Sequence, residues 1–166
     1  QKNTEELMQL VNDVLDLSRL EANMMKFQIQ EYDAVALCND AIYMARMRNE
    51  ETIEIYFDTH IETQPITTDT GRLIQALVST LTYPQKNTTH REITFTLTRD
   101  DSGKQICFRI SNSPLADPEF NSQEVSIRHD INRLLLQHFG GSYNITADEQ
   151  ERPVINFTYP LDIISE

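Results

Sequence analysis

A broad apolar stripe along the first 25 residues constrains the fold of this chain more than any other feature. Between Thr4 and Met25, apolar residues recur at steps of three and four, as on one face of a helix of about six turns. Val11 and Leu20 widen the stripe, and nothing in the next few residues could cover all of it. We therefore expect a partner helix in a bundle, while a helix packed only on its own domain is the alternative. The residues expected at the partner contact are Leu7, Leu10, Val14 and Leu17.

The rest of the sequence alternates between strand and helix periodicities. Residues 27–32 alternate like a short strand, and Asp33 is placed to cap a helix over 34–48. Further strands are expected at 53–57, 92–99, 105–111, 142–146 and 154–159, and further helices at 69–83 and 123–139. A hairpin turn is expected at 100–103. Pro84 is expected to end the helix over 69–83, and Gly140-Gly141 the helix over 123–139. This order predicts an α+β sandwich, with helices on one face of a mixed sheet.

Charge and cysteine usage narrow the classes of partner. The chain has 14 Lys and Arg against 26 Asp and Glu, a net charge of −12, which disfavours nucleic acid and anionic membranes as partners. Without a run of about 18 apolar residues, we expect no direct membrane contact from this segment. Cys38 and Cys107 lie in apolar runs without CxxC spacing, so both are expected to be buried free thiols in a reducing, cytoplasmic setting. Because the sequence opens inside a helix, we expect it to be a piece of a longer protein.

Four strings, in the same order along the chain, carry a resemblance to a known family. LVNDVLDLSRLEA (10–22) resembles the end of the second dimerisation helix of two-component sensor histidine kinases. DTGRLIQALVSTLT (69–82) is similar to the start of their N box, SIRHDINRLLLQHFGGSYNI (126–145) to the stretch after their second glycine box, and VINFTYPL (154–161) to their closing strand. The resemblance implies a Bergerat-type, histidine kinase ATPase-like sandwich over residues 27–166. Residues 1–26 would be part of the dimerisation and phosphotransfer bundle.

The N box of this sequence departs from the family pattern. In active members, one Asn of the N-box helix helps to hold the magnesium ion that bridges the ATP phosphates, and another Asn precedes it by one turn. Alignment on Gln75 and Leu77 puts Ser79 and Tyr83 at those two positions. Magnesium prefers compact oxygen ligands in near-octahedral geometry, so a phenol is a poor substitute. Lys86 matches a family Lys near the phosphates.

The first glycine box is also altered. The family's Asp-x-Gly-x-Gly supplies a carboxylate that accepts from the adenine amine, and glycines that let the backbone approach the base. In this sequence Asn112 replaces the Asp, and Pro114 and Ala116 replace the glycines. Asn112 still offers an acceptor, without the charge that roughly doubles the strength of such a bond.

The second glycine box has lost its glycines as well. Ser122 and Glu124 stand where the family's glycines expose backbone amides to the phosphates. Glu124 adds a negative charge beside an anionic ligand, and the loop between the two boxes, the ATP lid of the family, is short. A shifted alignment, with the functional Asn at Asn87 or Asn121, is the alternative.

The resulting hypothesis is a fragment of a sensor histidine kinase with a degenerate, pseudo-ATPase domain that acts through protein interaction and conformational signalling. No cofactor and no metal are expected, whereas active members use ATP and Mg²⁺. The expected partners are a second copy, bound through the first helix, and a response-regulator receiver domain or another kinase. The expected location is the cytoplasm, and the cytoplasmic part of a membrane-anchored sensor is one form that this location can take. An active ATP-dependent histidine kinase with an atypical site and a purely structural dimerisation scaffold are the alternatives.

The sequence offers no phosphoacceptor of the family type. None of its histidines lies in a His-Glu-x-x-x-Pro context, so each is expected to be an ordinary imidazole, and the phosphoacceptor would lie upstream of Gln1. These histidines are His60, His90, His129 and His138.

Overall fold

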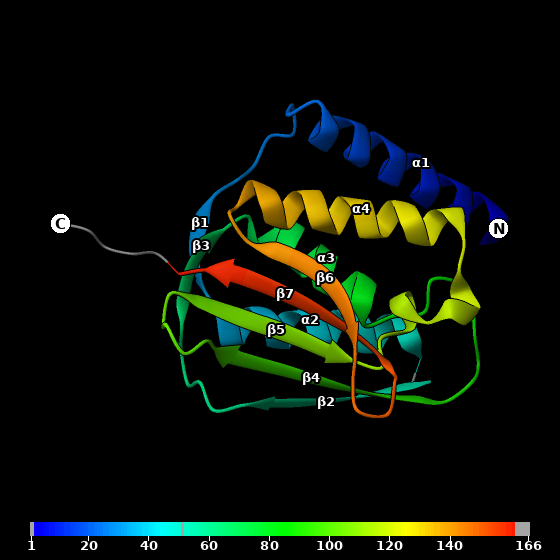
Figure 1. Cartoon of the computed structure of the whole chain (residues 1–166). Coiled ribbons are helices and arrows are strands. Elements are labelled where there is room, and N and C mark those ends of the chain that lie inside the picture. The colour runs from blue at the N-terminus through cyan, green and yellow to red at the C-terminus, as the bar shows by residue number, and fades with distance from the viewer. Residues whose placement is uncertain (1, 51, 162–166) are drawn as a thin grey trace.

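The computed structural model describes residues 2–50 and 52–161, and it shows a layer of helices against one face of a sheet (Figure 1). The helices are α1 (Lys2–Glu21), α2 (Ala34–Asn49), α3 (Thr70–Thr80) and α4 (Gln123–His138), with the short 3-10 helices η1 (Pro114–Ala116) and η2 (Pro118–Phe120). The strands are β1 (Gln30–Asp33), β2 (Ile53–Thr59), β3 (Pro65–Thr68), β4 (Arg91–Arg99), β5 (Gln105–Ser111), β6 (Ser142–Ala147) and β7 (Pro153–Pro160). The predicted α+β sandwich is confirmed.

The main sheet is mixed, as predicted. Its strand order is β2-β4-β5-β7-β6, in which only the β2–β4 pair is parallel. A second, two-stranded sheet pairs β1 with β3, with Gln30 opposite Thr68. The sequence prediction placed the first strand three residues too early and missed β3. Pro65 looked like a break, but a proline is tolerated as the first residue of a strand.

Strict alternation along the central strands builds the core. Ile93, Phe95 and Leu97 of β4 are fully buried, as are the alternate residues of β5 from Ile106 to Ile110. These side chains face the helix layer, because residues two apart in a strand share a face. Cys107 has the opposite parity and is only half-buried, which corrects the prediction that it is buried. Cys38 of α2 is fully buried, and burial raises the pKa of both thiols.

Local signals set the ends of the central helices. The Asp33 carboxylate accepts from the backbone amides of Val35 and Ala36, and Asp69 accepts from that of Arg72, so both are N-caps. Helix α3 ends at Thr80, before Pro84 could stop it. Helix α4 ends at His138, followed by Gly140 in the left-handed region, with φ of +83°.

Helix α1 is shorter than predicted. It ends at Glu21 rather than near Met25, because Asn23 adopts a left-handed conformation, φ 59°. The amide of Met24 then bonds back to the carbonyl of Arg19, which closes the helix with an asparagine in the position often taken by glycine.

Helix α1 lies along the outside of α4 (Figure 1). Asp13 forms a buried ion pair with Arg128 of α4, the two side chains being 8% and 11% exposed. Asp16 pairs with Arg72 of α3 at 3.2 Å. Both pairs join α1 carboxylates to arginines of the neighbouring helices.

The predicted apolar stripe of α1 is divided between two environments. Leu10 and Leu17 are half-buried against the domain, whereas Leu7 and Val14 are 61% and 43% exposed. Further large apolar residues of α1 are also exposed, namely Met8, Val11 and Leu15. The domain therefore covers one edge of the stripe and leaves the rest open.

Within residues 2–50 and 52–161, no helix is both long and apolar enough to cross a membrane.

Gly141 is the position where the fold tolerates no side chain. A Cβ there would lie 2.0 Å from the carbonyl oxygen of Thr158 in β7. We predict that Gly141→Ala lowers the free energy of unfolding by about 2–3 kcal/mol, because helix and strand must move apart. Gly71→Ala is the matched control, since its Cβ comes no closer than 3.7 Å to Asp69 and alanine favours helix. Urea denaturation of both variants measures this, and equal stabilities would contradict it.

The Asp13–Arg128 pair gives a second prediction. Asp13→Ala leaves a buried guanidinium without its carboxylate, so we expect the free energy of unfolding to fall by about 3–5 kcal/mol. The control is Asp130→Ala, which breaks an exposed pair with Arg133 and should cost no more than about 1 kcal/mol. Urea unfolding of the two proteins side by side decides, and an Asp13 variant as stable as the Asp130 variant would show that α1 is held by other contacts.

Candidate functional site

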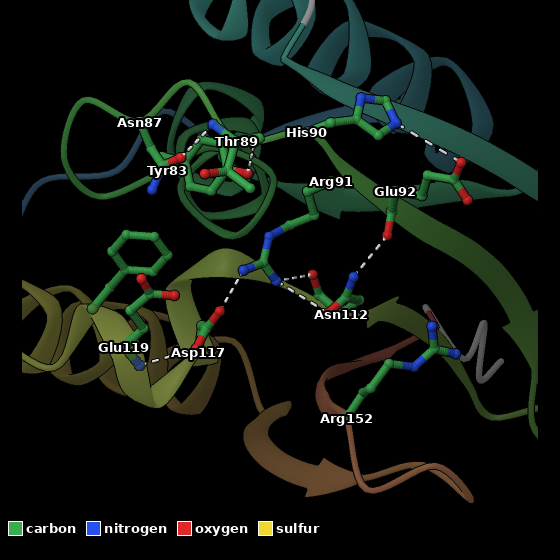
Figure 2. Close-up of a pocket in the computed structure, with 11 residues that line it drawn as sticks. Tyr83, Asn87, Thr89, His90, Arg91, Glu92, Asn112, Asp117, Glu119 and Arg152 are labelled. Carbon is green, nitrogen blue, oxygen red and sulfur yellow. Dashed lines mark hydrogen bonds and ion pairs between the residues drawn. The ribbon is translucent and has the colours of Figure 1, made fainter.

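A polar cavity of about 420 Å³ opens where α3, β4 and β5 end or begin near one another (Figure 2). The loop after α3, the start of β4, the end of β5 and the segment 112–121 form its walls. Its lining residues are Tyr83, Asn87, Thr89, His90, Arg91, Glu92, Asn112, Asp117, Glu119, Phe120 and Arg152.

Arg91 lies at the centre of this cavity. Its Nη1 donates to both the backbone oxygen and the Oδ1 of Asn112, each at 3.0 Å. Its Nη2 forms an ion pair with the carboxylate of Asp117. The guanidinium carbon lies 5.6 Å from the centre of the Tyr83 ring, within cation–π range. The Arg91 guanidinium in this cavity is thus engaged by other residues of the protein.

The segment between β5 and α4, residues 112–121, folds onto the end of α3. Ser113 is fully buried and donates its hydroxyl to the carbonyl of Thr80 at 2.7 Å. Leu115 and Phe120 are buried in the core, and the Phe120 ring stands edge-on to Tyr83 with centroids 5.5 Å apart. We call residues 112–121 the lid segment; it comprises the first predicted glycine box and the loop that leads to the second.

A second cavity, of about 320 Å³, lies between α1, α3 and the start of α4. It is lined by four of the predicted site residues, Ser79, Tyr83, Ser122 and Glu124. Two arginines and three acids also line it, and of these Arg128 is already paired with Asp13. The remaining charges are those of Arg48, Glu6 and Glu124, a balance that does not favour a polyphosphate.

The hydroxyls at the two N-box positions are used inside the protein. Ser79 donates to the carbonyl of Ala76 at 2.6 Å and accepts from the Asn132 amide at 3.1 Å. Tyr83 donates to the carbonyl of Thr89 at 2.6 Å. Both hydroxyl hydrogens are therefore directed to backbone carbonyls of the protein.

The other predicted positions have different surroundings. Lys86 is exposed in the loop after α3, at the edge of a further surface pocket. Pro114 is buried and Ala116 half-buried, both in η1, so they serve packing. Ser122 caps α4 by accepting from the amide of Val125, and Glu124 is exposed in the first turn of that helix.

Three residues that organise the cavity were missed by the sequence analysis: Arg91, Asp117 and Phe120. Arg91 opens a strand and Asp117 sits between two prolines, and neither position matches a motif. Phe120 offered a signal, because a large aromatic residue in a short polar loop often marks a buried anchor.

The histidines lie away from any acid–base arrangement in the described residues. His129 is half-buried, bonds through Nδ1 to the Tyr143 hydroxyl at 2.7 Å, and has its pKa lowered by burial, so it is neutral at pH 7. His138 stacks on Phe27, with ring centroids 4.2 Å apart. His90, with Glu54 and Glu92, forms an exposed group whose ligand atoms lie within 4.8 Å of one another, on the surface of β2 and β4.

Comparison with known proteins gives the fold. No protein-family model matches the sequence, and no curated protein matches it. Among solved structures, the histidine kinase AdeS of Acinetobacter baumannii superposes with a TM-score of 0.72 at 14% identity, over 98% of this chain and 82% of AdeS. Full-length ShkA in complex with AMPPNP gives 0.76 at 20% identity, over 99% of this chain and 38% of ShkA.

Histidine kinase ThkA in complex with the response regulator TrrA gives a TM-score of 0.66 at 16% identity, over 96% of this chain and 49% of that protein. The chain thus spans less than half the length of two of these three proteins. Sequence identities this low establish a shared fold and nothing about activity. The chain has the α+β sandwich fold of histidine kinase structures.

Proposed function

We propose that this chain is the signalling part of a sensor histidine kinase whose nucleotide site does not bind ATP, and that it acts through protein contacts. One observation carries the proposal. Tyr83, at the position of the family's magnesium-binding Asn, packs its ring against Phe120 and Arg91 and gives its hydroxyl to Thr89. A bulky phenol held in this way is a poor replacement for the compact amide oxygen that magnesium prefers.

The remaining features of the site support the same proposal. The lid segment is folded onto α3 by Ser113 and Leu115, and the phosphate side of the site carries Glu124 in place of glycine. The sandwich can fold without nucleotide-binding residues, because its core is built from alternating apolar residues.

The proposal divides the chain into two parts. Residues 1–26 would belong to a dimerisation bundle, and residues 27–166 to an ATPase-like domain that relays the state of that bundle. The buried thiol of Cys38 and the half-buried thiol of Cys107, both free, support a reducing, cytoplasmic setting.

A response-regulator receiver domain is the partner we favour after a second copy. Its support is the complex of ThkA with TrrA, whose kinase chain shares this fold over 96% of the present chain. A second kinase is the other candidate, and pull-down of purified receiver domains against purified kinase fragments distinguishes the two.

The first prediction from this proposal concerns nucleotide. Relative to an active site, Tyr83, Asn112 and Glu124 should each weaken the free energy of MgATP binding by about 1–1.5 kcal/mol. Together with the short lid, this sums to roughly 3–6 kcal/mol, or about two to four decades of affinity. Calorimetric titration with MgATP should therefore show no micromolar binding, and millimolar MgATP should not raise the Tm. Tyr83→Asn should behave identically, because the other losses persist. Micromolar binding by the parent protein would promote the active-kinase alternative.

The second prediction concerns self-association through α1. Leaving Leu7, Val11 and Val14 in water forgoes about 1.5–3 kcal/mol per side chain relative to burial, so a second α1 is the expected cover. Sedimentation velocity should show concentration-dependent dimers, which Leu7→Lys plus Val14→Lys abolishes.

The matched control for that experiment lies on α2. Tyr43 and Met47 are 66% and 67% exposed, more than Leu7 and Val14, so Tyr43→Lys plus Met47→Lys replaces exposed large side chains and adds the same charge. This variant should dimerise like the parent. A parent protein that stays monomeric at high concentration, or a control that loses dimers equally, would count against α1 as the interface.

A further inference from the structure

The acceptor at the base end of the site is already occupied by the protein. Asn112 stands where the family's first glycine box accepts a hydrogen bond from the adenine amine. In this structure its Oδ1 accepts from the Arg91 guanidinium at 3.0 Å, and its Nδ2 donates to the carbonyl of Glu92 at 3.0 Å (Figure 2). Both ends of the amide are therefore engaged, and a ligand would have to compete with Arg91 for the acceptor.

The backbone of Asn112 is held in the same arrangement. Its φ of 65° is left-handed, a conformation that asparagine tolerates better than most residues. The turn directs its carbonyl to Arg91 Nη1 at 3.0 Å, so one guanidinium nitrogen donates to both the main chain and the side chain of this residue. A lysine ammonium lacks the planar fork needed to do this and to reach a second group at the same time.

The other arm of the guanidinium reaches the lid segment. Asp117, between η1 and η2, accepts from Arg91 Nη2 and also from the amide of Glu119 at 2.9 Å. The Arg91 and Asp117 side chains are only 12% and 21% exposed, so solvent screens this pair less than a surface ion pair. The Tyr83 ring over the guanidinium adds a third contact.

These contacts have a common result. Arg91 is fixed at the start of β4, where its amide bonds to the carbonyl of Thr52, and from there it ties the end of β5 to the lid segment. By the resemblance to the first glycine box, a nucleotide base would bond to the same acceptor at position 112.

We propose that Arg91 is an internal occupant of the base position, which holds the lid segment closed without nucleotide. The inference rests on the proposed function, because it assigns the base position from the degenerate first glycine box. Its consequence is that the lid segment presents one constant surface, whatever the level of ATP.

Amide hydrogen exchange on the whole chain tests the clamp. Arg91→Met keeps the apolar stem and removes the guanidinium, and exchange across the lid segment should rise at least about tenfold relative to β7. Arg91→Lys should rise similarly, since the fork is lost. Arg152→Met is the matched control: Arg152 lines the same cavity but pairs with Asp148 in the β6–β7 turn, so lid exchange should stay unchanged.

Adenosine binding tests the occupancy. Adenosine lacks phosphates, so losses at the phosphate end do not affect it, and Arg91→Met should bind it at least about tenfold more tightly than the parent by calorimetry or ligand-observed NMR. Faster lid exchange with no gain in adenosine binding would make Arg91 a structural staple and overturn the occupancy. Unchanged lid exchange would overturn the clamp.

Two further results keep the test decisive. If Arg91→Met does not fold, Asp117→Asn removes the carboxylate charge that pairs with Arg91. It should raise lid exchange by a smaller factor, and no rise would refute the clamp. Micromolar MgATP binding by the parent refutes the proposed function as well. A parent that does not bind MgATP, with an unresponsive Arg91 variant, refutes this inference alone.

Discussion

Every second residue of β4, β5 and β7 points into one apolar core beneath the helix layer, and the rest of the structure depends on that alternation. Phe95, Phe108 and Phe157 are fully buried there, each on a different strand. The opposite parity carries Thr94, Thr96 and Arg109 to the open face. This stabilisation does not depend on the polar residues at the rim of the sheet, where the candidate site lies. The fold can therefore persist when those polar residues are exchanged.

Sequence patterns predicted those features whose cause is local. Asp33 and Asp69 cap helices through bonds to amides two or three residues away, and Gly140 ends α4 through its own φ. The pattern failed where a distant partner decides the outcome. Strand β3 exists because β1 pairs with it, and the chain between Pro65 and Thr68 shows no alternation strong enough to announce it.

The site shows the same division. Ser79, Tyr83, Ser122 and Glu124 were predicted to lie near one another from alignment, and the structure does bring them to one cavity. Lys86, Pro114 and Ala116 lie elsewhere, because a loop and a 3-10 turn carry them away from that cavity. Arg91 and Asp117 were not predictable, since their roles come from a contact 26 residues apart in sequence that no spacing rule encodes.

The two-sided character of α1 makes this helix sensitive to rotation about its own axis. Its carboxylates Asp13 and Asp16 engage Arg128 and Arg72, while Leu7 and Val14 face away from the domain. Successive residues of a helix are about 100° apart, so turning α1 by a single residue would carry Asp13 off Arg128 and set Asn12 or Val14 against the buried guanidinium. Only one angular setting of α1 therefore satisfies the domain, and a partner that grips the apolar side could read or impose that setting. A rotation of α1 about its axis, rather than a displacement along it, would then be the motion that is transmitted to α4.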